Sequence, residues 1–321
     1  MGSTAEAEVP TCLVLSDGRR GIENQALGLA ERCASLNPLN IIRHHISHNK
    51  LVEALPPKAQ LRLKSYTLPD CEMAIGCGRQ AIAPLLYLKI HRPKVMTVYV
   101  QDPRIGTSYF DLVIAPTHDE LRGANVESMI GSPNLVTEDR IVGETLNFAN
   151  GLSKLPAPRV AILIGGNSKS HKLDQSAHQQ HLKAVLNLKR AGFSTLITVS
   201  RRTPEFARHE WRKFASENPH VWLYDGEGPN PYFAFLGGAE IILVTEESTN
   251  MLTEACVTGK PVFRLPMSGK AGKFQILYDA LETHCGVKPY VGQLAGGDYP
   301  PLDETSRTAR IVWDRFKAFR K

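Results

Sequence analysis

The sequence predicts an α/β protein made of two Rossmann-like domains, each built on a parallel sheet. Three observations lead to this class. The 321 residues exceed the size at which one hydrophobic core stops growing, so two domains are expected. Short apolar runs recur along the chain, each followed by glycine or polar residues and then by a helical pattern, which is typical of repeated βαβ units. A proline-rich stretch near the middle separates two such series.

The first series begins with the apolar run 12–16, which we expect to be a strand. It is followed by a glycine-containing loop at 17–21 and by a helix at 22–36, whose apolar residues recur at helical spacing. A further helix is expected after Gly78 and a shorter one after Pro116. Four further strands are expected at 41–46, 72–75, 95–100 and 111–114. Together with the strand at 12–16 they predict an open sheet of about five strands.

We place the domain boundary where a predicted helix at 138–152 runs into Pro156 and Pro158, because two prolines in three residues stop a helix and stiffen the chain. The predicted domains are therefore 1–153 and 154–302. The final segment, 303–321, has the pattern of an amphipathic helix. Strands of the second domain are expected at 159–164, 194–199, 221–224, 241–244 and 261–265.

Composition narrows the class of protein. Apolar residues make up 42% and charged residues 22%, as in ordinary globular proteins. The six cysteines show no metal-binding or disulfide spacing, and no apolar run reaches the roughly 18 residues of a membrane span, so we expect a cytoplasmic protein with reduced thiols. The net charge of +6 suits an anionic partner, such as nucleic acid, a phosphorylated substrate or an acidic membrane surface that the protein binds peripherally, and charge alone does not choose among them. Nucleic acid is not favoured, because the basic residues form no stripe interleaved with aromatic residues.

Ligands of open α/β sheets bind beyond the carboxyl ends of the strands, so the loops at those ends hold the candidate site residues. Gly165, Gly166, Asn167 and Ser168 follow the first strand of the second domain, and their small size lets backbone amides approach an anion such as a diphosphate. An ordinary turn in which glycine supplies a positive φ is the alternative. Arg201, in a pair with Arg202 after the next strand, is placed for phosphate contact, or is a solvated loop charge.

A third loop begins a helix with Ser248, Thr249 and Asn250. Ser248 or Thr249 can cap this helix and leave its first amides facing a ligand. Glu254 falls near the second turn, where its carboxylate can accept hydrogen bonds from two ribose hydroxyls. This loop therefore predicts a nucleotide site.

The Ser/Thr-rich helix start, the Glu-Ala pair and the Gly-Lys-Pro exit resemble the nucleotide site of glycosyltransferases with the GT-B architecture. From about Cys12 to about Glu282, the chain also resembles the mitochondrial fission family of plants and bacteria, whose bacterial members are described as candidate glycosyltransferases or nucleoside-diphosphate-sugar epimerases. The further motifs that carry this resemblance are Leu15-Ser16-Asp17-Gly18, Gly21 with Asn24-Gln25, Gln101-Asp102-Pro103-Arg104 and Ile164-Gly165-Gly166-Asn167. One departure is Glu247-Ser248, where the family commonly has Asp-Ser, and the reach of this carboxylate is left open.

The resemblance implies a GT-B-like fold with two facing domains and a cleft between them. It also implies a nucleoside-diphosphate sugar as co-substrate in the second domain, an acceptor at the first, and no permanently bound cofactor. The helix expected at 303–321 is implied to pack back on the first domain. The absence of a DxD pair or a His/Asp cluster favours a metal-independent reaction. Asp17, Asp102 and His118 are the candidate general bases, because each follows a strand of the first domain. Asp17 is preferred, since burial beside its strand would raise its pKa. Asp17 and Asp102 can instead be turn residues, and His118 a neighbour of a helix cap.

We therefore expect a glycosyltransferase that moves a sugar from a nucleoside-diphosphate donor to a saccharide or lipid-linked acceptor at the cytoplasmic membrane face. A nucleoside-diphosphate-sugar epimerase or hydrolase is the second hypothesis. A non-catalytic adaptor that retains the fold is the third, as the mitochondrial role of plant relatives suggests.

Overall fold

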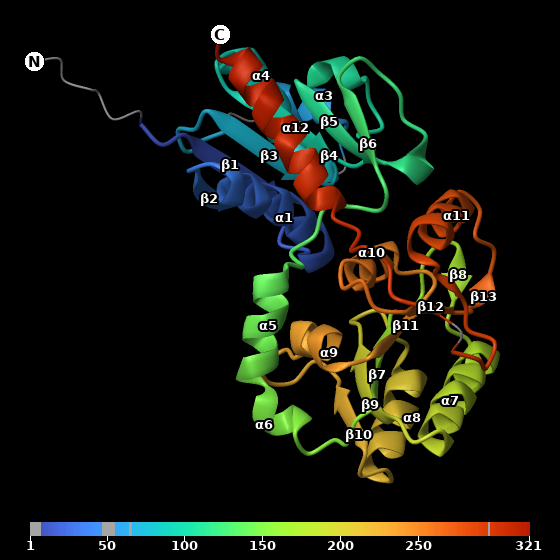
Figure 1. Cartoon of the computed structure of the whole chain (residues 1–321). Coiled ribbons are helices and arrows are strands. Elements are labelled where there is room, and N and C mark those ends of the chain that lie inside the picture. Colours follow the sequence, from blue (N-terminus) through green and yellow to red (C-terminus); the bar gives the residue numbers. More distant parts are fainter. Residues whose placement is uncertain (1–7, 47–54, 64–65, 295) are drawn as a thin grey trace, which may run out of the picture. The chain divides into compact units, whose positions relative to one another are not determined.

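The computed structural model describes residues 8–46, 55–63, 66–294 and 296–321. The chain folds into two compact units (Figure 1). The first comprises Met1–Leu135 together with Asp303–Lys321, and the second comprises Val136–Leu302. Each unit has its own sheet and its own core, and each is described by itself.

The first unit is built on a parallel sheet that has six strands among the described residues, in the order β2-β1-β3-β4-β5-β6. The central strands are apolar on both faces because helices cover both, which explains why they read as continuous apolar runs. The sequence predicts five of the six strands and misses β6, a short edge strand. The strands are β1 (Thr11–Ser16), β2 (Asn40–His45), β3 (Met73–Cys77), β4 (Met96–Val100), β5 (Leu112–Pro116) and β6 (Val126–Met129).

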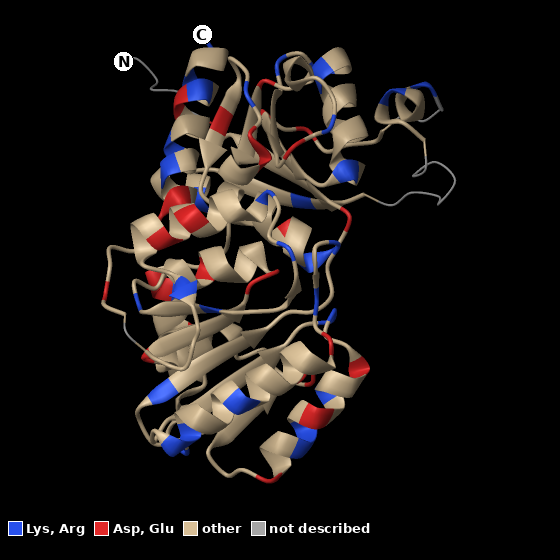
Figure 2. Ribbon diagram, turned by 90° about the vertical axis from the view of Figure 1, so that its right-hand side faces the viewer, with Lys and Arg blue, Asp and Glu red and all other residues tan. Residues whose placement is uncertain are grey.

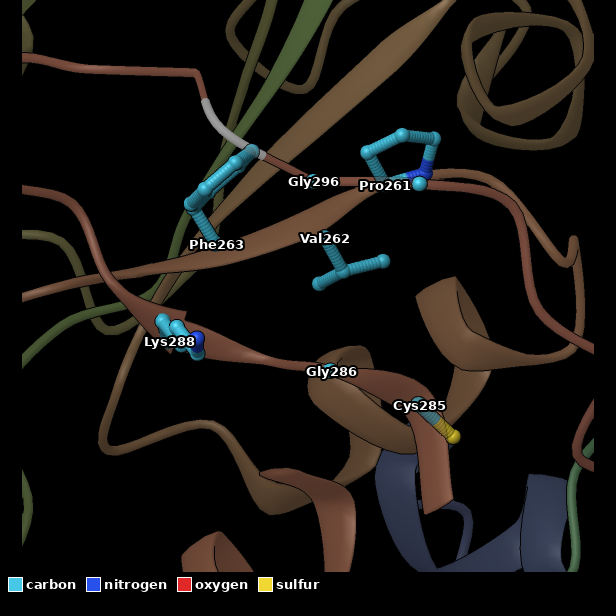
Figure 3. Close-up of a pocket in the computed structure, with 8 residues that line it drawn as sticks. Pro261, Val262, Phe263, Cys285, Gly286, Lys288 and Gly296 are labelled. Atoms are coloured by element: carbon cyan, nitrogen blue, oxygen red, sulfur yellow. The ribbon is translucent and has the colours of Figure 1, made fainter. Parts of the chain in front are cut away.

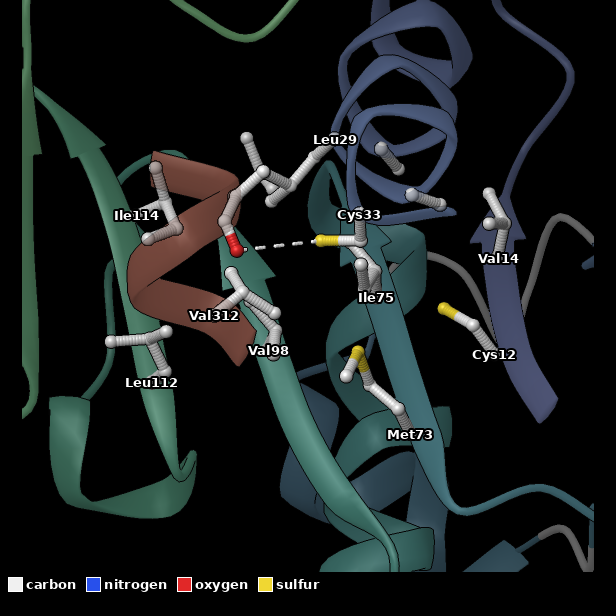
Figure 4. Packing of buried hydrophobic residues seen from close by; sticks show 14 of the residues in the cluster. Cys12, Val14, Leu29, Cys33, Met73, Ile75, Val98, Leu112, Ile114 and Val312 are labelled. Carbon is white, nitrogen blue, oxygen red and sulfur yellow. Dashed lines mark hydrogen bonds between the residues drawn. The ribbon is translucent and has the colours of Figure 1, made fainter. Parts of the chain in front are cut away.

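Two helices, α1 (Arg20–Leu36) and α12 (Glu304–Phe319), cover one face of this sheet (Figure 4). They are fastened to each other, since the indole N–H of Trp313 donates to the main-chain oxygen of Cys33 at 2.7 Å. The other face is covered by α3 (Pro57–Leu63) and α4 (Arg79–His91). Single 3-10 turns, η1 (Thr107–Tyr109) and η2 (Thr117–Asp119), follow β4 and β5.

The second unit repeats the plan with a parallel sheet in the order β10-β9-β7-β11-β12-β14. Its strands are β7 (Arg159–Ile164), β9 (Ser194–Val199), β10 (Val221–Tyr224), β11 (Ile241–Thr245), β12 (Val262–Leu265) and β14 (Lys288–Pro289). A small antiparallel pair joins β8 (His171–Lys172) to β13 (Ser268–Gly269). The helices are α7 (Gln175–Arg190), α8 (Glu205–Ser216), α9 (Tyr232–Gly238), α10 (Thr249–Cys256) and α11 (Phe274–Cys285).

The boundary between the units lies at residues 135 and 136, whereas the sequence places it after residue 153. The difference arises because α5 (Glu138–Asn147) and α6 (Ala149–Leu152) pack onto the second unit. A Cβ added to Gly237 of α9 would lie 2.1 Å from the Thr145 hydroxyl of α5, and one added to Gly151 of α6 would lie 2.3 Å from the Trp222 ring of β10. The prolines mark the end of these helices but not the change of unit.

Acidic and basic residues are interspersed over the elements of both units (Figure 2). In the described part of the chain, no helix combines the length and the apolar character that crossing a membrane requires.

Candidate functional site

The second sheet brings two of the predicted loops together. Its strand order changes direction between β7 and β11, and this switch point is where ligands bind in open α/β sheets. The loop that follows β7 is joined here to the segment between β11 and α10. The amide of Gly165 donates to the Thr245 hydroxyl at 2.8 Å, and the amide of Gly166 donates to Glu247 Oε1 at 2.7 Å.

Gly165 and Gly166 are needed for close approach and not for an unusual backbone conformation. Neither has a positive φ, so the alternative of an ordinary turn that requires one does not apply. A Cβ on Gly165 would lie 1.8 Å from Glu247 Oε1, and a Cβ on Gly166 would lie 2.0 Å from the main-chain oxygen of Arg202. Any side chain at these positions would push the three loops apart.

The predicted role of the amides at 165–168 needs correction. Besides the two glycine amides, the amide of Asn167 donates to the Arg202 oxygen at 3.3 Å and that of Ser168 to the His171 oxygen at 2.9 Å. All four amides thus serve acceptors within the protein, because neighbouring loops close over this turn. The side-chain oxygen of Asn167 is also used, since it accepts from the Leu173 amide at 2.9 Å. This loop therefore builds the floor of the site and does not present a cradle of open amides.

Glu247 is the residue that ties these loops together, although sequence reasoning left its reach open. Its side chain has 0% exposure and lies 3.4 Å from Arg202 Nη2. Burial raises the pKa of Glu247, against the opposing effects of hydrogen bonds from the Gly166 amide and the Thr245 hydroxyl and of the Arg202 charge. Both arginines of the pair after β9 are exposed, and Arg202 is the one that contacts Glu247. Two adjacent arginines in a sequence give no signal that distinguishes them.

The helix α10 begins at this junction. Ser248 occupies the N-cap position and is buried, but its side chain makes no capping hydrogen bond, so the first turn of the helix is not capped by this hydroxyl. Thr249 and Asn250 are the first helical residues and are partly exposed. The helix therefore starts where the sequence places it, with Ser248 at the N-cap position but without the capping hydrogen bond expected of its side chain.

Glu254, one turn further along α10, is held by a partner that sequence reasoning missed. Its Oε2 accepts a hydrogen bond from the Tyr232 hydroxyl at 2.5 Å. Burial raises the pKa of Glu254 to about 7, although the tyrosine bond acts in the opposite direction. Tyr232 is the first residue of α9 and follows the loop after β10. That loop lies at the same edge of the sheet, and this position is the signal that would have pointed to Tyr232.

A second charged cluster, also missed, lies at the ends of β11 and β12. Glu246 is 3.5 Å from Arg264 Nη1 and 3.8 Å from His171 Nε2. The Arg264 guanidinium lies over the Tyr278 ring, 4.2 Å from its centroid. Burial lowers the pKa of His171, against the charge of Glu246, so the imidazole is neutral near neutral pH. Glu246 and Glu247 thus point to different partners from adjacent positions.

The three candidate bases of the first unit follow β1, β4 and β5, so they share the carboxyl edge of their sheet. Asp17 does not have the raised pKa expected of it. Burial acts in that direction, but hydrogen bonds and the charge of Arg19, 2.6 Å away, outweigh it and hold the pKa of Asp17 below its usual value. Asp102 pairs with Arg104 at 2.8 Å and also accepts its amide, as a turn residue does. His118 is buried in η2.

A small cavity of about 230 Å³ in the second unit lies away from these groups (Figure 3). Pro261 and Val262, at the amino end of β12, line it together with Cys285 and Gly286 at the end of α11. Ligand sites of parallel sheets are found at the carboxyl ends of the strands, so this cavity is not the counterpart of the predicted site.

Two Rossmann-like units, each with a six-stranded parallel sheet among its described residues, define the GT-B fold class. Solved structures of this class are similar over nearly the whole chain. A UDP-GlcNAc 2-epimerase from Methanocaldococcus jannaschii has a TM-score of 0.53 and 12% identity, and covers 95% of this chain and 99% of its own. The catalytic domain of starch synthase IV from Arabidopsis thaliana, bound to ADP and acarbose, has a TM-score of 0.53 and 8% identity, with coverage of 98% and 99%.

The chain belongs to the mitochondrial fission ELM1 family, whose model matches residues 20–316. Mitochondrial fission protein ELM1 of Arabidopsis thaliana is 27% identical over 280 residues, which are 78% of this chain and 65% of that protein. The chain thus spans a little less than two thirds of this relative. An uncharacterized protein of Rickettsia prowazekii is 22% identical, and the match covers 93% of this chain and 96% of that one.

Proposed function

We propose that this protein is a glycosyltransferase that moves a sugar from a nucleoside-diphosphate donor to a saccharide or lipid-linked acceptor. The observation that carries the proposal is the junction at the switch point of the second sheet. There Glu247 joins the Gly166 loop to Arg202 beside the start of α10, and Glu254 follows one turn later. A cationic side chain, a helix N-terminus and a carboxylate at this spacing suit a diphosphate and its ribose.

In this proposal the diphosphate binds at the first turn of α10, with Ser248, Thr249 and Asn250, and is neutralised by Arg201 and Arg202. Those cations and the helix N-terminus stabilise the leaving diphosphate without a metal ion. The Tyr232 hydroxyl occupies Glu254 Oε2, so the other oxygen of this carboxylate accepts from the ribose hydroxyls. The Gly165–Ser168 backbone supports the ligand by its shape and not by its amides.

The acceptor is assigned to the first unit, where Asp102 and His118 remain candidate general bases. Asp17 is a weaker candidate, because its lowered pKa makes it a poor proton acceptor at neutral pH. The net charge of +6 favours binding of the protein to an anionic membrane surface, where a lipid-linked acceptor would lie.

A nucleoside-diphosphate-sugar epimerase or hydrolase is the second candidate function, since a structural neighbour is named a UDP-GlcNAc 2-epimerase. A non-catalytic adaptor is the third, in view of the plant relative named for mitochondrial fission.

Release of free nucleotide, together with the fate of the sugar nucleotide, separates these functions. The purified chain is incubated with UDP-, GDP-, ADP- and dTDP-sugars, with and without saccharide or lipid-linked acceptors, and both the free nucleotide and the remaining or isomerised sugar nucleotides are quantified. A transferase releases nucleotide only with an acceptor, and Glu254→Ala lowers the rate at least about tenfold if it loses one charge-assisted hydrogen bond. Glu210→Ala, on α8 and bonded to glutamines of α7, serves as the control and retains the rate. Release of nucleotide without acceptor supports the hydrolase, and conversion of the donor to an isomeric sugar nucleotide without release supports the epimerase. No turnover of any donor supports the adaptor.

A further inference from the structure

The carboxyl group of Glu247 is entirely buried, and the cation beside it is Arg202. Glu247 Oε1 accepts from the Gly166 amide at 2.7 Å and lies 3.4 Å from Arg202 Nη2. Among the residues that the structure describes, Oε2 has no hydrogen-bond partner. The Gly166 amide and the Thr245 hydroxyl also favour the charged form of Glu247, but Arg202 is the full positive charge that does so. A buried carboxylate depends heavily on such a cation, because losing the partner of a buried charge is far more costly than losing a surface one.

The other charged groups around Glu247 have partners of their own. Glu246, beside it, pairs with Arg264 of β12 and lies near the neutral His171. From α11, the Tyr278 hydroxyl donates to the main-chain oxygen of Glu246 at 2.8 Å and is not ionised, because burial raises its pKa. In the described part of the chain, Arg202 is therefore the cation within 4.0 Å of Glu247.

Arg202 itself is only half buried. Its side chain is 51% exposed, and its second contact, from Nη1 to the Asn167 oxygen, is long at 3.5 Å. It lies on the loop between β9 and α8, beside the junction where the proposed diphosphate binds. A diphosphate carries more negative charge than one carboxylate and offers bidentate acceptors, so it competes effectively for this guanidinium.

We propose that binding of a nucleoside diphosphate draws Arg202 from Glu247 to the phosphate groups, and that Glu247 then takes up one proton from solvent. This inference rests on the proposed nucleotide site. The neutral acid stays buried, with Oε1 still accepting from the Gly166 amide and the new proton on Oε2. Burial already favours the protonated form of Glu247, as its raised pKa reflects, so removing the cation tips the balance.

The exchange makes nucleotide binding dependent on pH. The complex carries more protons than the free protein, so affinity falls as pH rises, by up to about tenfold per pH unit where uptake is complete. In the proposal, Arg202 pairs with the Glu247 carboxylate in the free protein and with the diphosphate in the complex. The protonation of Glu247 then sets the pH range in which the nucleotide binds tightly. The Glu247 carboxylate would repel the ligand if it kept its charge.

Calorimetry at about pH 7, in buffers of different ionisation enthalpy, tests the proposal. The probes are UDP-N-acetylglucosamine and ADP-glucose, whose diphosphate diesters do not titrate near neutral pH. Wild type should take up a measurable fraction of a proton on binding, up to one per ligand. Glu247→Gln should bind with no uptake, and the control Glu210→Gln should behave as wild type. Binding without uptake in wild type, or equal uptake in Glu247→Gln, would overturn the proposal.

A second arm needs no ligand, so it separates this proposal from a failure of the proposed function. Arg202→Met should lower the unfolding midpoint more at about pH 8, where Glu247 is ionised, than at about pH 5. The difference in midpoint between wild type and Arg202→Met should grow by about 2–4 °C for each kcal/mol of lost pairing energy. In the Glu247→Gln background the effect of Arg202→Met should not change with pH. If the midpoint difference between wild type and Arg202→Met does not change with pH, Arg202 and the charge of Glu247 are uncoupled, and the proposed transfer of Arg202 from Glu247 to the diphosphate is overturned.

Discussion

Substitution of Gly166 by alanine probes the junction of the three loops most severely. The added Cβ would lie 2.0 Å from the Arg202 main-chain oxygen and 2.1 Å from its carbonyl carbon, and backbone atoms cannot turn aside as a side chain can. The same methyl group would move the Gly166 amide away from Glu247 Oε1, to which this amide donates a hydrogen bond at 2.7 Å. Because Gly166 has no positive φ, backbone strain does not add to the effect.

Overpacking of this kind costs about 1–3 kcal/mol, and loss of the buried hydrogen bond adds about 1–3 kcal/mol. We expect Gly166→Ala to destabilise the second unit by about 2–6 kcal/mol, which lowers its unfolding midpoint by roughly 4–24 °C. Gly143→Ala is the matched control. Gly143 lies in α5 with no atom within 4 Å of an added Cβ. Alanine there should stabilise the protein by about 0.5–1 kcal/mol through helix propensity.

Urea unfolding followed by circular dichroism measures both variants. A double mutant sharpens the test. In Gly165→Ala the clash is with the carboxyl end of the Glu247 side chain, so adding Glu247→Ala should recover part of the lost stability. The same addition should not rescue Gly166→Ala, whose clash is with the backbone. If Gly166→Ala is as stable as wild type, or is rescued by Glu247→Ala, the described packing of the loops is refuted.

Three further predictions concern single contacts. The pKa of Glu254 is raised to about 7, so the folded protein binds more protons than the unfolded chain between about pH 4.5 and 7. The free energy of unfolding should therefore fall as pH rises through this range, by at most about 3 kcal/mol. Glu254→Gln should remove this pH dependence, as measured by thermal unfolding. Lys260 Nζ donates to three main-chain oxygens at the end of α9, each at 2.7 Å, and Lys260→Met should lose about 2–4 kcal/mol in urea unfolding. Trp313→Ala should cost the first unit about 3–5 kcal/mol and raise amide exchange in α1, whereas Trp313→Phe should cost less.

Each of these has a clear contrary result. A Glu254→Gln variant with an unchanged pH slope would place the titrating group elsewhere. A Lys260→Met variant of wild-type stability would mean that the α9 carbonyls find other donors. Unchanged exchange in α1 after Trp313→Ala would show that α1 does not depend on this contact.

The fold could be predicted largely from hydrophobic runs because parallel strands are buried on both faces and stand out as continuous apolar segments. The exceptions are short or marginal elements. The edge strand β6 is only four residues long, and β14 is two residues ending in a proline. The boundary between the units was misplaced because α5 and α6 join the second unit by tertiary packing at Gly237 and Gly151, which no local pattern reveals.

The candidate site was predictable at the level of loops and not of atoms. The parallel topology places Gly165, Ser248 and Glu254 at the carboxyl edge of one sheet, and that much follows from the strand pattern. The partners of each group come from strands and helices far apart in the chain. Tyr232 lies 22 residues from Glu254, and Glu247 lies 81 residues from the Gly166 amide that it accepts. Sequence reasoning therefore assigned the loop amides to a ligand, when side-chain and main-chain oxygens of the protein already accept from them.

The most direct test of the account is the thermal stability of the purified protein with UDP, GDP, ADP, TDP and CMP, measured for wild type, Glu254→Ala and Glu210→Ala. A ligand at about a hundred times its dissociation constant should add about 2.7 kcal/mol, which is readily seen as a raised midpoint. We predict that one nucleoside diphosphate raises the midpoint of wild type and of Glu210→Ala, but not of Glu254→Ala. No shift with any nucleotide, or an equal shift in all three proteins, would contradict a nucleotide site at the switch point of the second sheet.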